Sequence, residues 1–150
     1  MEPEGMVHAL TEIHRLLEPS GILIDIHPLP RPGLFEVRRD DAVLFSRTEL
    51  DFSPEPFRQA QHALDEVVRQ GLFTLERVRE FDFFVFGSSV SELSAYLEEQ
   101  DEFEGEPDAE FQKRREELDS ALQEALLEAG AEAKVAAHVV ATVSSLKAVP

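Results

Sequence analysis

Asp25 and His27 are the residues of this chain whose types and spacing best suit chemistry. They stand two positions apart at the end of the apolar run Ile22–Ile26, and alternate residues of a β-strand point to the same face. The carboxyl end of a strand is where open α/β sheets place their ligands, so we interpret this pair as a functional candidate. Pro28 and Arg31 follow closely, and the four residues form the predicted ligand site. The alternative interpretation makes His27 a loop residue and Asp25 a polar strand end.

A metal site is the first weaker candidate. His8, Glu12 and His14 are ligand types for a metal, but only His8 and Glu12 have the i, i+4 spacing of one helix face. A solvated helix face explains all three residues, so no metal ligand is predicted.

Two further patterns have simpler explanations than a functional site. Ser88 and Ser89 follow Gly87, but the Gly-x-Ser-x-Gly frame of a nucleophile elbow is absent, and helix capping accounts for both serines. An acidic stretch lacks the spacing of an EF-hand and is interpreted as a loop of repelling charges. Its carboxylates are Asp101, Glu102, Glu104, Glu106 and Asp108. No catalytic residue is therefore predicted.

The candidate ligand site follows a helix, a turn and a strand. Apolar residues at helical spacing predict a helix that ends near Leu17, because Pro19 disfavours helical geometry at the residue before it. Gly21 permits the turn. The run Ile22–Ile26 is apolar almost throughout, which predicts a strand covered on both faces in a parallel or mixed sheet.

The remaining elements follow from periodicity and from punctuating proline, glycine and capping residues. A hairpin is predicted although its turn, Arg39-Asp40-Asp41, lacks the favoured Asn-Gly or Asp-Gly pair. Ser53 is predicted to cap the next helix. The expected elements are hairpin strands 34–38 and 42–47, helix 54–70, strand 72–86 with a bend or bulge, a helix after Ser89, a helix after Pro107-Asp108, and strand 135–146.

The segment Leu10–Ile26, with Arg15-x-Leu17-x-Pro19-x-Gly21 at its centre, resembles the part of class I S-adenosylmethionine-dependent methyltransferases that leads into their fifth strand. The family usually has Lys-Pro-Gly-Gly where this chain has Glu18-Pro19-Ser20-Gly21. The order of the later elements is also similar. Residues 22–26, 75–86 and 135–146 would be strands five, six and seven, with strand seven antiparallel between the other two.

The resemblance implies an α+β fold derived from an α/β one. We expect a small mixed sheet, with strands in the order five-seven-six plus a hairpin, packed with about four helices. A chain of 150 residues, 43% of them hydrophobic, can bury one sizeable core. A single domain over residues 1–150 is therefore predicted.

The cofactor half of that family has no counterpart in this sequence. The family holds S-adenosylmethionine with a glycine-rich turn, and the seven glycines here include no Gly-x-Gly. We therefore expect no cofactor for the chain alone, and S-adenosylmethionine only if a partner completes the fold. Whether the chain belongs to an enzyme stays open.

The absence of strands one to four predicts a partner. Strand five would keep an apolar edge, Ile22–Ile26, with unpaired backbone groups. A homodimer that covers this edge is the simplest expectation. Alternatives are a different chain that supplies the cofactor half, or the hairpin folding back within a monomer.

Three functional classes remain. The favoured one is a methyltransferase-like protein without its cofactor half, retained to bind a partner or small ligand at His27–Gly33 and the strand ends. The second is the substrate-side part of a methyltransferase that is split over two chains or read from a late start. The third is an unrelated α+β domain.

Charge and composition argue against nucleic acid and membranes as partners of this chain. A formal charge of −17, with 14 basic residues, disfavours nucleic acid. No apolar run approaches the roughly 20 residues of a membrane-spanning helix, and the N-terminal residues are acidic where a secretory signal is basic. The absence of cysteine fits a cytoplasmic protein.

Overall fold

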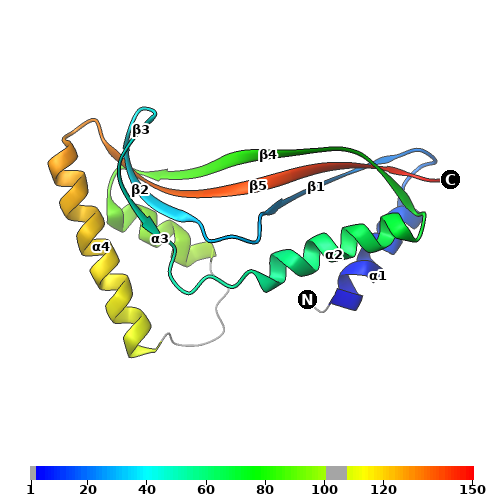
Figure 1. Cartoon of the computed structure of the whole chain (residues 1–150), viewed down its shortest axis with the longest axis horizontal. Coiled ribbons are helices and arrows are strands. Elements are labelled where there is room, and N and C mark those ends of the chain that lie inside the picture. The colour runs from blue at the N-terminus through cyan, green and yellow to red at the C-terminus, as the bar shows by residue number, and fades with distance from the viewer. Residues whose placement is uncertain (1–2, 101–107) are drawn as a thin grey trace. The chain divides into compact units, whose positions relative to one another are not determined.

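The computed structural model describes residues 3–100 and 108–150, which contain four helices and five strands (Figure 1). The elements are α1 (Pro3–Leu16), β1 (Ile22–Pro28), β2 (Leu34–Arg39), β3 (Ala42–Thr48), α2 (Glu55–Arg69), β4 (Phe73–Gly87), α3 (Val90–Gln100), α4 (Ala109–Ala129) and β5 (Lys134–Ala148). The predicted α+β class and order of elements are confirmed.

The sheet is built around β5. Its strand order is β1-β5-β2-β3, and β4 also pairs with β5. β1 runs antiparallel to β5, from Ile22 opposite Lys147 to Pro28 opposite Ala141. β2 is antiparallel to β5 as well. A mixed sheet was expected, but the observed sheet is antiparallel. The reason is that the strands beside β5 have the opposite direction to β5. β5 lies between β1 and β4, the order predicted for strands five, seven and six.

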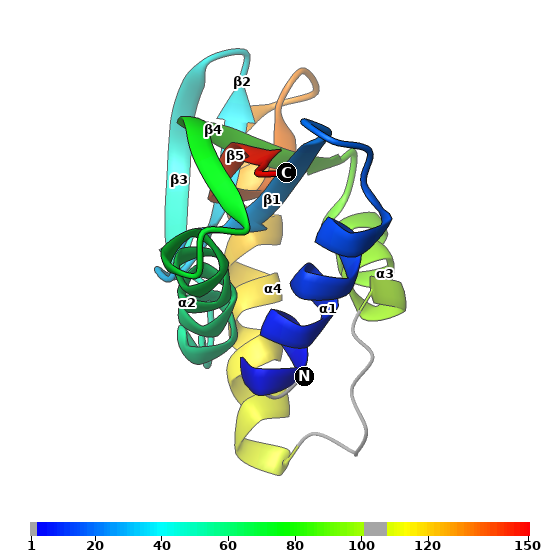
Figure 2. The same ribbon diagram turned by 90° about the vertical axis from the view of Figure 1, so that its right-hand side faces the viewer.

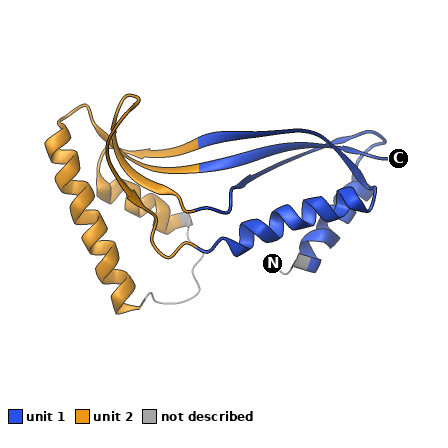
Figure 3. Cartoon of the chain, in the orientation of Figure 1, with its two compact units in different colours: residues 1–31, 53–82, 140–150 blue, residues 32–52, 83–139 orange. Residues whose placement is uncertain are grey.

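The chain divides into two compact units, residues 1–31, 53–82 and 140–150 in unit 1 and residues 32–52 and 83–139 in unit 2 (Figure 3). Both β4 and β5 contribute residues to each unit. The prediction of a single domain stays a prediction, because one domain can contain two compact units.

In unit 1, α1 and α2 lie on one side of the strands (Figures 1 and 2). Leu64 and Val67 of α2 are three positions apart on one helix face and pack with Phe73 and Leu146. Partly buried residues complete this core; they are Val7, Leu10, Leu17, Leu23, Val68 and Leu72. The unit therefore has its own core between two helices and one sheet face.

The other face of β1 is open. Ile22, Ile24 and Ile26 are 54%, 55% and 62% exposed, whereas the alternating residues are partly or fully buried. The prediction that this strand is covered on both faces is wrong. Its physical reason is that both helices of unit 1 lie on the same side of the strands, so period-2 alternation leaves every second residue uncovered.

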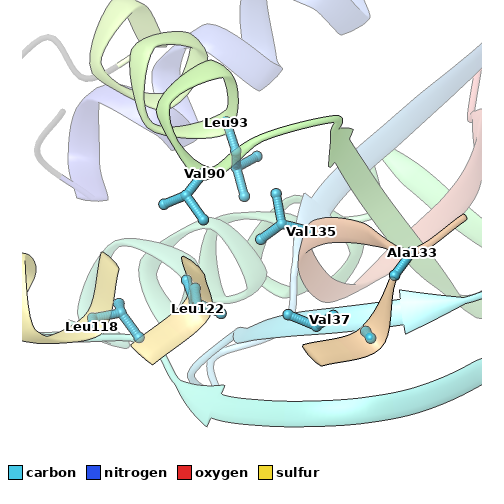
Figure 4. Packing of buried hydrophobic residues seen from close by; sticks show 8 residues of the cluster. Val37, Val90, Leu93, Leu118, Leu122, Ala133 and Val135 are labelled. Carbon is cyan, nitrogen blue, oxygen red and sulfur yellow. The ribbon is translucent and has the colours of Figure 1, made fainter. Parts of the chain in front are cut away.

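Unit 2 has a separate core beneath α3 and α4 (Figure 4). Val37 of β2 and Val135 of β5 are opposite each other in the strand register and are fully buried. Their side chains pack with Leu93, Leu118 and Leu122. Leu118 and Leu122 belong to α4, so they confirm the predicted apolar stripe of this long helix.

Turn and cap residues explain where several elements begin. Asp40 has φ +53° in the β2–β3 turn, and aspartate tolerates the left-handed region, so the predicted hairpin forms without Asn-Gly. Ser89 Oγ accepts from the backbone N–H of Glu92 at 3.1 Å, which confirms the predicted cap of α3. The hydrogen bond from the Ser88 backbone N–H holds the pKa of the Glu92 carboxyl below its usual value.

The predicted cap of α2 is wrong. The capping position is Pro54 and no side chain caps the helix, which begins at Glu55. Pro54 already has helical dihedral angles, so Ser53 lies one residue too early. Asp108 caps α4 by accepting from the Phe111 backbone N–H at 2.7 Å.

Leu122 and Leu127 provide a matched test of the unit 2 core, since both lie on α4 but are 1% and 84% exposed. Leu122→Ala is expected to lower the free energy of unfolding by about 2–5 kcal/mol, because it leaves a cavity. Leu127→Ala is expected to change it by less than about 0.5 kcal/mol. Urea denaturation followed by circular dichroism measures both; equal effects would contradict the assigned packing.

Candidate functional site

The position of β1 is fixed at its start by Gly21. The Gly21 backbone N–H donates to the Glu18 carbonyl at 2.8 Å, and its carbonyl accepts from the Ala148 N–H at 2.8 Å. A Cβ at Gly21 would lie 2.9 Å from the Glu18 carbonyl oxygen, so only glycine fits without a shift. This turn sets the register that carries Asp25 and His27.

Asp25 and His27 are joined by a hydrogen bond. His27 Nδ1 lies 2.5 Å from Asp25 Oδ2 on the helix-facing side of β1. His27 is a strand residue and is only 8% exposed, so the loop interpretation is wrong. The carboxylate orients the imidazole, and within the described residues Nε2 has no hydrogen-bond partner. The predicted pair is thus brought together in a form that can present one ring nitrogen.

Two hydroxyl residues of β5 lie opposite this pair. Thr142 is opposite His27 and Ser144 is opposite Asp25, and directly opposite Cβ atoms are about 4.5–5.5 Å apart. Thr142 is 2% exposed, and its Oγ1 has no hydrogen-bond partner in the described part of the chain. The oriented imidazole and this buried hydroxyl therefore lie on the same face of neighbouring strands.

Sequence reasoning missed Thr142 and Ser144. Both lie in the predicted closing strand at alternate positions, a pattern that marks one face of a strand. Only the strand register places that face beside Asp25 and His27. The signal was therefore present but could not be assigned to the site.

Pro28 and Arg31 do not join the pair. Pro28 ends β1, and Arg31 is exposed in the loop that follows. The Arg31 backbone N–H donates to the Leu29 carbonyl at 2.8 Å. Within the described residues, no hydrogen bond or ion pair connects the Arg31 side chain to Asp25 or His27. Of the four predicted residues, Asp25 and His27 thus form a half-buried and buried pair, Pro28 is half-buried beside them, and Arg31 is exposed.

A second charged cluster lies in unit 2 and was not predicted. Glu36 is 3% exposed. Its Oε2 accepts from Arg38 Nη1 at 2.7 Å, and its Oε1 lies 3.2 Å from His138 Nδ1. The Phe84 ring stacks on His138 at a centroid distance of 4.3 Å, and the Arg38 guanidinium carbon lies 4.8 Å from the Phe84 centroid. The buried carboxylate is thus held on both oxygens, which favours a structural role.

A shallow pocket of about 220 Å³ lies beside this cluster. Two cationic and two anionic side chains line it together with Phe86, so its charges nearly cancel. The lining residues are Arg38, Asp40, Phe86, Glu132 and Lys134.

Two of the three residues weighed as metal ligands have other contacts. His14 Nε2 lies 2.8 Å from the Val149 carbonyl oxygen, and Glu12 pairs with Arg15. Across residues 3–100 and 108–150, no group of three or more histidine, aspartate or glutamate side chains is arranged to hold a metal ion. Asp101, Glu102, Glu104 and Glu106 lie outside the described residues, and Asp108 caps α4.

Comparisons with models of known protein families, with curated proteins and with solved structures found no match. The resemblance to methyltransferases stays a prediction based on Leu10–Ile26 and the order of the elements. None of the helices described is both long and apolar enough to span a membrane.

Thr142→Val tests whether the buried hydroxyl is unpartnered in the folded chain. We expect the free energy of unfolding to stay unchanged or rise by about 1 kcal/mol, because an unsatisfied hydroxyl no longer has to be buried. The control is Thr74→Val, at an exposed position of β4. A loss of more than about 1 kcal/mol for Thr142→Val would show that the hydroxyl has a partner.

Glu36→Ala tests the charged cluster of unit 2. We expect a loss of about 3–5 kcal/mol in the free energy of unfolding, because Arg38 and His138 lose the carboxylate that holds them. Glu12→Ala removes the exposed pair with Arg15 and is expected to cost less than about 1 kcal/mol. Chemical denaturation measures both variants, and similar losses would argue against a special role for Glu36.

Proposed function

We propose that this chain is a methyltransferase-like binding protein without the S-adenosylmethionine-binding half, inactive as a methyltransferase by itself. One observation carries the proposal. β5 lies between β1 and β4 and is antiparallel to β1, the arrangement expected for strands five, seven and six. The motif that suggested the family, Arg15-x-Leu17-x-Pro19-x-Gly21, stands directly before β1. The sequence motif and the strand order are the two features that support this proposal.

The proposed ligand site is the pair Asp25 and His27 with Thr142. The three side chains lie on one side of the β1–β5 ladder. They offer an oriented imidazole and an unpartnered hydroxyl, which suits a small polar group better than a large apolar one. Pro28, half-buried at the end of β1, and Arg31, exposed in the loop that follows, also belong to the proposal.

The glycines support the absence of a cofactor turn. Among the described residues, Gly71 and Gly130 are the glycines with positive φ, and both stand at the ends of helices α2 and α4. A nucleotide cradle needs glycines that let backbone N–H groups approach the phosphates or the adenosine. We therefore propose no cofactor for the chain alone.

The second candidate function is the substrate-side part of a methyltransferase split over two chains. The specific observation in its favour is the free edge of β1, because the family pairs its fifth strand with strand four. A second copy of this chain is the partner that we favour for that edge. The charge of −17 argues against nucleic acid as a partner, and we propose a cytoplasmic location.

Isothermal titration with S-adenosylmethionine tests the proposal. We expect no binding by the purified chain at ligand concentrations up to about 1 mM, corresponding to less than about 4 kcal/mol of binding free energy. A methyltransferase with a complete glycine-rich turn is the positive control. Micromolar binding by the chain alone would refute the proposed function. Binding that appears only after a second chain is added would support the split enzyme instead.

A further inference from the structure

We propose that a second copy of the chain closes the free edge of β1 in a single register, with Ile24 on the two-fold axis. This inference rests on the proposed partner at that edge and adds the partner's geometry. It follows from three properties of β1, which are the direction of its backbone groups, the exposure of its side chains and the position of its one carboxylate.

The backbone groups that face the free edge belong to Ile22, Ile24 and Ile26. The Gly21 carbonyl accepts from the Ala148 N–H at 2.8 Å, and the Leu29 N–H donates to the Val140 carbonyl at 2.9 Å. In an antiparallel ladder, hydrogen-bonded residues alternate with residues that face away. Odd-numbered residues of β1 therefore bond to β5. The described residues contain no other strand that pairs with β1.

The same three isoleucines present their side chains on the open face of the sheet. Their neighbours on β5 are Lys147 opposite Ile22, Ser145 opposite Ile24 and Val143 opposite Ile26. This face of the β1–β5 ladder thus carries no carboxylate, although the whole chain has 31 acidic residues. Another equally acidic chain can approach here with little charge repulsion.

Two-fold symmetry restricts how two copies of β1 can pair. With Ile24 on the axis, Ile22 of one copy lies opposite Ile26 of the other, and Asp25 lies opposite Leu23 of the other. Each copy then pairs the N–H and C=O groups of all three isoleucines. The isoleucine side chains form one continuous apolar stripe.

The two neighbouring registers, with Asp25 or Leu23 on the two-fold axis, would be less stable. With Asp25 on the axis, the two Asp25 carboxylates would face each other directly, which destabilises a strand pair. Pro28, which has no N–H, would then lie opposite Ile22. With Leu23 on the axis, Ile26 would lie opposite Ser20, outside β1, whose φ is +66° and therefore not extended. Only the register with Ile24 on the axis pairs the backbone groups of all three isoleucines without these conflicts.

Disulfide trapping tests this register, because the natural chain contains no cysteine. In Ile24→Cys, the two cysteines of a dimer would be a hydrogen-bonded pair with Cα atoms about 5.5 Å apart, within disulfide range. In the control Ile22→Cys, the two cysteines would be roughly 14 Å apart, beyond that range. We expect a covalent dimer from Ile24→Cys alone, and from a mixture of Ile22→Cys with Ile26→Cys.

Light scattering and Ile24→Lys complete the test. The natural chain is expected to have the mass of a dimer, and Ile24→Lys is expected to raise the dimer dissociation constant roughly tenfold or more, since two like charges would meet on the axis. Circular dichroism checks that each variant is folded. A monomeric natural chain, or trapping by Ile22→Cys alone, would overturn the inference. Neither result depends on the S-adenosylmethionine titration, which tests the proposed function separately.

Discussion

The antiparallel ladder of β5 is the constraint on which the rest of this structure depends. β5 pairs with β1, β2 and β4, so its register decides which residues of three other strands become neighbours. In unit 2 it places Val135 opposite Val37 and lets both pack under α3 and α4. In unit 1 it places Leu146 with Phe73 in the core beneath α1 and α2. The two halves of β5 thus contribute residues to the cores of different units.

The same ladder brings polar groups into unit 1 that stability alone does not require. Within the described residues, Thr142 keeps a buried hydroxyl without a partner, which costs free energy that a valine of similar shape would not. Unit 2 is different, because the carboxylate of Glu36 is engaged on both oxygens by Arg38 and His138. An unsatisfied hydroxyl beside an oriented imidazole is a better candidate for ligand contact than a satisfied ion cluster.

The sequence predicts this fold well where the signals are local. The apolar spacing before Leu17, the proline and glycine that follow, and the cap at Ser89 all act within a few residues, and the elements that they predict are present. Long-range features were not predictable in this way. Glu36 and His138 are 102 positions apart, and Thr142 becomes a neighbour of His27 only through the register of two strands that are far apart in the chain. Sequence periodicity also cannot say which face of β1 the helices cover.

The same three residues of β1 have side chains on the open face of the sheet and backbone groups on its free edge. A β1 strand that stayed uncovered would therefore be unusual. Natural edge strands are usually protected by charged side chains, prolines or bulges. β1 has Pro28 only at its end, and its one carboxylate, on Asp25, points to the helix side and is engaged by His27. In the part of the chain that the structure describes, Ile22, Ile24 and Ile26 therefore combine unpaired backbone groups with exposed apolar side chains. Such an edge strand pairs readily with another strand. The near-palindromic sequence around Ile24 supports our proposal that this strand comes from a second copy of the chain.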